Sequence, residues 1–494
     1  MEFEAYYKSL GLKSYPFSKF TAEAEMDKAE EIYKKPSNYS VINELISGSS
    51  IIISGERGSG KTALNLDIGR RKDTKDTLLV RLEDFSKLAE NYSHDDVYKF
   101  ITEVIAGHFF IKMSFSPNVL WKYDNDERID LSMYLSEYVP TSTKNQLKEH
   151  IKIIQNGFLK RTGIKLYNLF RIILNYGMKA ATKAVSDAIT KHFSALPEFD
   201  SGDAEYFIKL ETEIDETFTL EDRSFHYLDK LCKLILKSNI KQIVILIDKI
   251  DEDPRFKNDA ERIAKYIEGI ASNNKIMIND SFNVVLFTWS TPFNSIKSNI
   301  RTQKISFQPL SWTSKGLREA AGKRLSAFSN NETKKLESIF EENSYDAINE
   351  LVLMCNENPR DFWHLLDKSI VSQFELDSGS KITAKAVHLG IEKFVKQFNY
   401  YEYYPRKANA RADSMDIYSY IKHLMKLDSN EFTKNKLKDA AKTGGSTNNY
   451  VVSMENMGLI KKTGGKTSQG GVIYEIRDPK VRYAREKEIA ISRA

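Results

Sequence analysis

The sequence predicts an α/β fold with a parallel sheet, a large helical insertion, a helical lid and a C-terminal winged-helix domain. Two observations point to the sheet. An apolar segment at 50–54 is followed by a glycine-rich loop, a helical stretch at 62–70 and a second apolar segment at 77–82, and this order opens a parallel sheet. Apolar runs at 241–248 and 283–288 each end in polar residues, as buried parallel strands do.

The other elements follow the chain in order. Residues 39–47 have the pattern of a short amphipathic helix, and 304–307 that of a last strand. The stretch from 95 to 236 is too long for a simple crossover, so we expect a helical insertion there. Its helices are expected at 97–110, 145–161 and 206–218, and further helices at 313–371. Packing and scaffolding is the favoured role of the insertion, because nothing in it has catalytic spacing.

Composition limits the class of protein. The chain has 494 residues, of which 41% are hydrophobic and 29% charged, a globular profile for roughly two to four domains. Its two cysteines, Cys232 and Cys355, form neither a disulfide framework nor a CxxC pair. We see no secretory leader and no run of ~18 apolar residues. We therefore expect a cytoplasmic protein with no membrane partner.

The positive charge is concentrated near the C-terminus. Residues 401–494 contain 18 Lys/Arg and 11 Asp/Glu, a net charge of +7, whereas the whole chain has +5. The preceding 400 residues therefore carry −2. A local excess of this sign favours an acidic partner such as nucleic acid.

The strongest motif is a glycine-rich loop with the pattern G-x-x-x-x-G-K-T. Its residues are Gly55, Glu56, Arg57, Gly58, Ser59, Gly60, Lys61 and Thr62. The backbone N–H groups would surround phosphate oxygens, and the dipole of the following helix would add positive potential. Lys61 would contact the β- and γ-phosphates, and the Thr62 hydroxyl would bind Mg²⁺. Between a strand and a helix, this loop predicts a P-loop NTPase.

An acidic segment follows the strand at 241–248. A carboxylate at the end of a strand beside the P-loop strand would hold Mg²⁺, and Asp248 has that place. Glu252, or alternatively Asp251, would be the catalytic base that polarises the attacking water. Lys61 completes the set of catalytic candidates. Alone, the segment would be interpreted as a solvated turn; with the P-loop it predicts a magnesium-dependent nucleotide site.

Other polar residues are weaker candidates. The strand at 283–288 ends in Thr288, and Ser290 and Thr291 follow; these would orient water or touch the γ-phosphate, or have no function. An Asn-Pro-Arg sequence ends at Arg360, which would reach back to the phosphates or be a surface arginine at an ordinary helix start. Arg301 is a candidate arginine finger for a neighbouring subunit.

These motifs resemble the STAND and origin-recognition (initiator) branch of AAA+-related ATPases. The resemblance covers about three quarters of the chain, and its specific parts are the P-loop and the acidic segment. It implies ATP rather than GTP, a nucleotide-dependent switch or loader, and a sensor arginine at Arg360. Two features depart from the STAND pattern: Thr291 stands where a T-S-R-P type box has its arginine, and no repeat array follows the winged helix.

The predicted division of the chain follows from these motifs. The segments are an N-terminal segment (1–36), the first part of the ATPase core (37–94), a helical insertion (95–236), the second part of the core (237–310), a helical lid (311–412) and a winged-helix domain (413–494). In the last, helices are expected at 416–427, 433–441 and 447–457, and strands around 461–462 and 472–476, joined by a glycine-rich tip at 464–471.

If the winged helix binds DNA, its third helix would enter the major groove. Polar residues at the start of that helix would contact bases, and lysines of the wing would contact phosphates. The base-contacting candidates are Ser446, Thr447, Asn448 and Asn449, and the phosphate-contacting candidates are Lys461, Lys462 and Lys466. An interdomain packing role for this unit is the alternative.

Two functions are therefore consistent with the sequence. The first is an ATP-binding and ATP-hydrolysing switch coupled to nucleic acid through the winged helix. The second is an ATP-gated signalling or antiviral-defence ATPase that oligomerises or binds a protein partner through the helical insertion.

Overall fold

The centre of the molecule is a five-stranded parallel sheet. The computed structural model describes residues 2–114, 119, 122–139, 219–406 and 415–492. The strands are β1 (Ile51–Gly55), β2 (Thr77–Leu82), β3 (Gln242–Ile247), β4 (Asn283–Trp289) and β5 (Ser306–Pro309), in the order β2-β3-β4-β1-β5. Each overlaps a segment that the sequence predicts as a strand. The prediction that the strand of Asp248 lies beside the P-loop strand was wrong, because β4 lies between β3 and β1.

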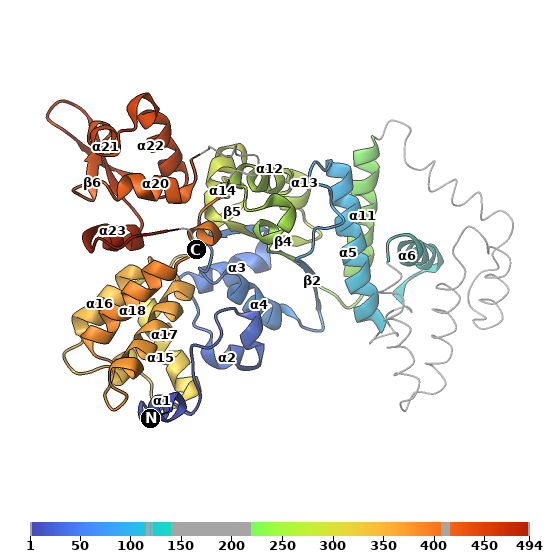
Figure 1. Ribbon diagram of the computed structural model, residues 1–494. Coiled ribbons are helices and arrows are strands. Elements are labelled where there is room, and N and C mark those ends of the chain that lie inside the picture. Colours follow the sequence, from blue (N-terminus) through green and yellow to red (C-terminus); the bar gives the residue numbers. More distant parts are fainter. Residues whose placement is uncertain (1, 115–118, 120–121, 140–218, 407–414, 493–494) are drawn as a thin grey trace.

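Helices cover both faces of the sheet (Figure 1). The side chains of β1 alternate: Ile51 and Ile53 pack with α3 (Tyr39–Gly48) and α4 (Lys61–Lys72) in one core cluster. Ile52 belongs to the larger cluster on the opposite face, as the two-residue period of a strand requires. That face is covered by α5 (His94–Ser114), α11 (Leu220–Lys237), α12 (Ala260–Ala271), α13 (Asn274–Met277) and α14 (Ser290–Ile296). The result is a three-layer α/β/α arrangement.

The described part of the predicted insertion shares its core with the sheet. Helices α5, α6 (Asn125–Glu137) and α11 contribute buried residues to the same cluster as β2 and β3, among them Phe109, Tyr134 and Leu231. The helix predicted at 97–110 lies within α5, whereas those predicted at 145–161 and 206–218 lie outside the described residues. Across the part of the chain that the structure describes, no helix is long and apolar enough to span a membrane.

A helical unit packs below the sheet domain in the view of Figure 1. It contains α15 (Ser314–Phe328), α16 (Tyr345–Met354), α17 (Pro359–Leu376) and α18 (Ala384–Gln397). The N-terminal helix α1 (Phe3–Ser9) joins its core, with Tyr6, Leu12 and Phe17 buried among residues of α15 to α18. Between α1 and the sheet, α2 (Ala29–Ile32) lies close to α15. The first 36 residues are therefore attached to the helical unit, close to the edge of the sheet.

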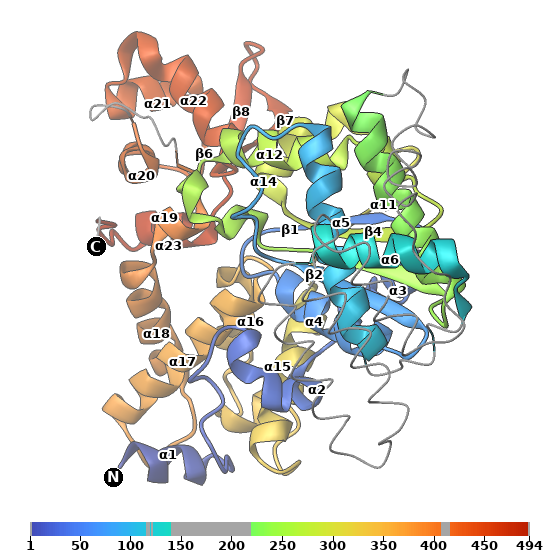
Figure 2. The same cartoon turned by 90° about the vertical axis from the view of Figure 1, so that its right-hand side faces the viewer.

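The C-terminal residues form a third unit with its own core. After α19 (Tyr400–Tyr403), it contains α20 (Ile417–Leu424), β6 (Glu431–Thr433), α21 (Lys434–Ala441), α22 (Thr447–Asn456), β7 (Ile460–Lys466), β8 (Val472–Ile476) and α23 (Pro479–Glu486). The three strands form an antiparallel sheet in the order β6-β8-β7. The three helices and the hairpin agree with the sequence prediction. Strand β6 was missed, because three residues are too few to show an alternating pattern. Figure 2 shows this unit beside α12 and α14 of the sheet domain.

Candidate functional site

The glycine-rich loop connects β1 to α4 in the geometry that phosphate binding requires. Gly58 and Gly60 have φ values of 81° and 94°, a left-handed region in which glycine carries no steric penalty. The Lys61 side chain turns back over the loop, and its Nζ donates to the carbonyl oxygens of Gly55 (2.9 Å) and Glu56 (3.1 Å). The helix start therefore presents an ammonium group and free N–H groups at the carboxyl edge of the sheet.

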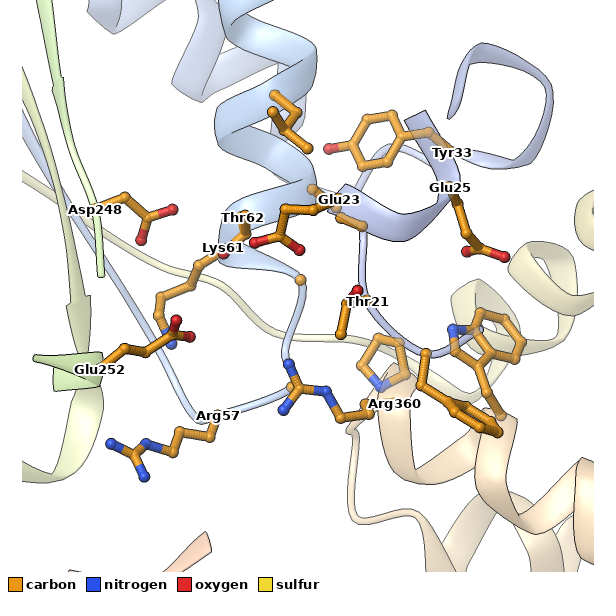
Figure 3. A pocket seen from close by; sticks show the side chains of 18 of the residues that line it. Thr21, Glu23, Glu25, Tyr33, Arg57, Lys61, Thr62, Asp248, Glu252 and Arg360 are labelled. Atoms are coloured by element: carbon orange, nitrogen blue, oxygen red, sulfur yellow. The ribbon is translucent and has the colours of Figure 1, made fainter. Parts of the chain in front are cut away.

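Lys61 and Thr62 line a cavity of about 500 Å³, which Asp248 and Glu252 also line. Figure 3 shows the two acidic side chains on the side of the cavity that β3 forms, facing the start of α4. Asp248 directly follows β3 and is only 2% exposed. Its Oδ2 accepts a hydrogen bond from Asn65 Nδ2 at 3.0 Å, and its Oδ1 accepts from the backbone N–H of Lys249 at 2.9 Å. Burial raises the pKa of Asp248, while Asn65 and Lys61 act in the opposite direction.

The two candidate bases have different surroundings. Asp251 is 8% exposed and forms an ion pair with Arg57, whose Nε lies 3.1 Å from the Asp251 Oδ2. Glu252 is exposed, lines the cavity and has no ion pair with any residue that the structure describes. Loss of hydration in the cavity, followed by repulsion from Asp251 and Asp248, raises the pKa of Glu252. A carboxylate with a raised pKa is a better proton acceptor at neutral pH, so Glu252 suits the role of base better than Asp251.

The side chain of Arg57 is a structural bridge. Its guanidinium donates to the carbonyl oxygens of Asp251 (2.7 Å) and Glu402 (2.9 Å) and lies over the Trp289 ring, 4.3 Å from the ring centroid. The neighbouring Glu56 accepts from the indole N–H of Trp289 at 2.9 Å. Both side chains therefore attach the loop to the residues around it. The loop pattern did not reveal these contacts, because its x positions carry no sequence signal.

The helix that begins with the Asn-Pro-Arg sequence contacts the P-loop directly. Asn358 Nδ2 donates to the carbonyl oxygen of Arg57 at 2.7 Å, and its Oδ1 accepts from the N–H groups of Arg360 and Asp361, which caps α17. Arg360 is exposed toward the cavity, and Figure 3 shows its guanidinium pointing from α17 toward the P-loop. The structure thus brings this predicted sensor residue to the same cavity as Lys61.

The N-terminal segment forms another wall of the cavity, across from Asp248 and Glu252, and no sequence motif predicted this. Figure 3 shows Glu23, Glu25 and Tyr33 on this wall. Lys249 Nζ lies 3.0 Å from the Glu23 carboxylate, which links the segment to the acidic loop. Although burial acts to raise it, a backbone hydrogen bond, Lys249 and Arg360 lower the pKa of Glu23. At the other end, Arg324 of α15 donates to Glu25 (2.8 Å).

The remaining candidates of the core lie outside the cavity lining. Thr288 is the last residue but one of β4 and lies opposite Ser54 of β1; it is 1% exposed and has no hydrogen-bond partner for its hydroxyl in the described part of the chain. Ser290 begins α14 and is half-buried. Arg301 is exposed and precedes β5, so it lies near the amino ends of the parallel strands, away from the cavity of its own chain. Whether it acts on a neighbouring subunit stays a prediction.

The C-terminal candidates differ in accessibility. The structure does not place Thr447 on the surface, where the sequence predicted it to lie. Thr447 is 6% exposed, and its hydroxyl donates to the carbonyl oxygen of Gly444 at 2.7 Å, so it supports the start of α22. The neighbouring residues Ser446, Asn448 and Asn449 are exposed. Lys461 and Lys462 are ion-paired within the unit, with Glu475 (2.6 Å) and Glu455 (2.8 Å). Lys466 is exposed, and exposed lysines also occur on or just after α21, namely Lys436, Lys438 and Lys442.

The cavity residues fit a nucleotide-bound Mg²⁺ better than a metal held by protein alone. Within the described residues, no group of three or more His, Cys, Asp or Glu could hold a metal ion. One hydroxyl (Thr62) and one buried carboxylate (Asp248) line the same cavity as the P-loop lysine. Mg²⁺ is usually bound by one or two carboxylates together with phosphate oxygens and water, and this donor set matches that pattern.

Comparisons with known proteins give little beyond this geometry. No protein-family model matches the chain, and no curated protein has a similar sequence. Among solved structures, the ORC2 protein of Aeropyrum pernix, described in complexes with ADPNP and ADP, is similar over 98% of each chain with 11% identity and a TM-score of 0.36. At such a TM-score, no property of that protein is transferred to this chain.

Proposed function

We propose that the protein is an ATP-dependent switch that binds and hydrolyses Mg²⁺·ATP in this cavity. The observation that carries the proposal is the convergence of Lys61, Thr62, Asp248, Glu252 and Arg360 on one cavity of about 500 Å³. These residues come from three separate parts of the chain, and each has the chemistry that one part of a magnesium triphosphate needs. A cavity of this size belongs to the range that holds small ligands and cofactors.

Each residue has a distinct part in the proposed reaction. The loop N–H groups and Lys61 bind the phosphates, and Lys61 exchanges its carbonyl contacts for phosphate oxygens. Thr62 and Asp248 hold Mg²⁺, which when bound neutralises phosphate charge. Glu252 accepts a proton from the attacking water, and Arg360 stabilises the charge of the γ-phosphate. At the opposite wall, the apolar parts of Ile32, Tyr33 and Leu66 offer a surface for the adenine ring of ATP.

The test is equilibrium binding of labelled ATP. Lys61→Ala should abolish binding, because the ammonium group is the main positive charge beside the phosphates. Lys72→Ala on the same helix is the matched control, since Lys72 is half-buried at the far end of α4, where its Nζ donates to Ser47 Oγ, and it should bind ATP like the wild type. Retained binding in Lys61→Ala would refute the assignment of the cavity.

We propose that DNA is the partner of the C-terminal unit, which we interpret as a winged helix. Its support is the exposed polar and basic surface of α21, α22 and the β7–β8 hairpin, together with the local net charge of +7 counted above. Replacing Lys461, Lys462 and Lys466 with alanine should reduce the slope of log K against log salt by up to about 3, close to one unit per lost phosphate contact. The control is the same change at three exposed lysines of the helical unit, Lys334, Lys335 and Lys381.

A second function is favoured by a different observation. The connector to the C-terminal unit is held by the segment after the acidic loop: Asn258 Nδ2 donates to the carbonyl oxygens of Tyr401 and Tyr404, both at 2.9 Å. This docking suits an ATP-gated signalling or defence protein in which the winged helix is an interdomain module. Sizing with an ATP analogue, with and without duplex DNA, separates the two functions: assembly that needs no DNA supports the second.

A further inference from the structure

A buried amide connects the two elements that would hold Mg²⁺. Asn65 is 0% exposed and lies on α4, three residues after Thr62, so that it is almost one helical turn away. Its Nδ2 donates to Asp248 Oδ2 at 3.0 Å, across the boundary between α4 and the end of β3. We propose that Asn65 is a positioning residue that sets the orientation of the Asp248 carboxylate for Mg²⁺·ATP. This inference rests on the proposed function of the cavity.

The hydrogen bonds of Asp248 show how the orientation is fixed. Each carboxylate oxygen has one donor: Oδ1 accepts from the Lys249 N–H at 2.9 Å, and Oδ2 accepts from Asn65. An ionised carboxylate can accept about four hydrogen bonds, so both oxygens keep lone pairs for a ligand on the cavity side. The backbone donor alone would leave the carboxylate free to turn about its Cβ–Cγ bond. Asn65 removes that freedom.

Packing alone does not account for an asparagine at this position. The Asn65 Oδ1 is buried and has no hydrogen-bond partner among the residues that the structure describes. A buried polar atom without a partner destabilises the fold, and the neighbouring residues Leu64 and Ile68 of the same helix lie in the apolar core. A leucine would fill the same space without this cost. The amide therefore contributes what leucine cannot, a donor to the metal-binding carboxylate.

The location of Asn65 predicts a selective effect. The groups that bind the triphosphate itself, namely the loop N–H groups and the Lys61 ammonium, precede Thr62 in the chain, whereas the Asn65 amide group donates to Asp248. Residues that orient metal ligands typically change metal affinity by about 10- to 100-fold when they are mutated. Loss of the amide should therefore weaken the contribution of Mg²⁺ and leave metal-free nucleotide binding unchanged.

The experiment is a titration of labelled, slowly hydrolysed ATP analogue into the full chain, in EDTA and at a series of Mg²⁺ concentrations. In Asn65→Leu the Mg²⁺ concentration for half-maximal enhancement of binding should rise by about 10- to 100-fold, with the dissociation constant in EDTA within twofold of the wild type. Asn65→Ala should give the same result and serves if the leucine variant does not fold. Asn273→Leu is the matched control, because Asn273 is also buried and hydrogen-bonded, to Tyr98. It precedes β4 in the chain and so lies toward the amino ends of the strands, whereas the cavity lies at their carboxyl ends.

A double-mutant cycle separates positioning from a general effect. If Asn65 acts through Asp248, then Asn65→Leu should cause no further change of Mg²⁺ dependence in an Asp248→Ala background. An unchanged Mg²⁺ dependence in Asn65→Leu, or an equal loss of binding in EDTA, would overturn the inference. A wild-type protein that binds no nucleotide would instead overturn the proposed function, so the two failures are distinguishable.

Discussion

A buried lysine between the helical unit and the C-terminal unit allows a quantitative prediction. Lys480 of α23 is 0% exposed, and its Nζ lies 3.3 Å from Asp361 Oδ2 on α17 and 3.5 Å from Asp478 Oδ1. The ammonium group also lies over the rings of Phe398 and Tyr403, 4.3 and 5.0 Å from their centroids. Lys480→Met keeps the length of the side chain but leaves the buried Asp361 without its cation.

Removing one partner of a buried ion pair costs about 3–5 kcal/mol. Because every 1.4 kcal/mol is a tenfold change in an equilibrium constant, the local opening of α23 should become about 150- to 4,000-fold more frequent. The assay is hydrogen exchange of the α23 amides, which reports local opening in a chain with several units. Lys487→Met is the control, since Lys487 is exposed at the end of the same helix. Exchange in Lys480→Met within tenfold of the control would refute the reasoning.

The pH dependence gives an independent check on the same variant. Burial raises the pKa of Asp361 even though Lys480 acts to lower it, and the loss of Lys480 should raise that pKa further. A carboxyl group whose folded pKa exceeds its unfolded value contributes stability at low pH that is lost as the pH rises through the folded pKa. The difference in exchange between variant and wild type should therefore be largest at neutral and alkaline pH and decrease as the pH falls. A difference that grows toward low pH would contradict this assignment.

Three further predictions concern the cavity. Glu252→Gln should keep ATP bound and lower the hydrolysis rate by about 10²–10⁴-fold; unchanged turnover in a single-turnover assay would move the base elsewhere. Asn358→Ala removes both the α17 cap and the bond to the P-loop, so it should weaken ATP binding by about 2- to 12-fold, whereas Thr313→Ala, which removes only a helix cap, should not. Gly58→Ala should lower the thermal unfolding temperature more than Gly464→Ala. Both glycines have a φ of 81°, so the backbone strain is matched. A Cβ at Gly58 would lie 2.4 Å from Asn358 Oδ1, whereas a Cβ at Gly464 would have no neighbour within 4 Å.

The parts of the structure that depend on local patterns were predictable. Strands β1, β3 and β4 are short apolar runs, and a parallel strand buried on both faces needs such a run. The P-loop combines a strand, two glycines with positive φ and a helix start, and all of these follow from eight adjacent residues. Asp248 was identifiable because it comes directly after an apolar run. The helix starting at Pro359 was identifiable from its asparagine cap and its proline.

The parts that depend on distant contacts were not predictable from one sequence. The order of the strands decides whether Asp248 lies one or two strands from the P-loop, and no local pattern encodes that order. Glu23 was overlooked because a charged residue in an irregular segment has no distinctive spacing; only the fold brings it to within 3.0 Å of Lys249. Thr447 was misjudged for a related reason: a polar residue at a helix start can face solvent or support its own turn, and the sequence does not distinguish the two.

The contacts of Arg57 explain why the neighbouring acids Asp251 and Glu252 have different surroundings. Its guanidinium is shared among the Asp251 carboxylate, two backbone carbonyl groups and the Trp289 ring. Asp251 is therefore ion-paired and held in place, and after loss of hydration its negative charge is the next cause of the raised pKa of Glu252. One of the two carbonyl groups belongs to Glu402, in the connector to the C-terminal unit. Arg57 therefore contacts both the connector to the C-terminal unit and the carboxylate next to the proposed base.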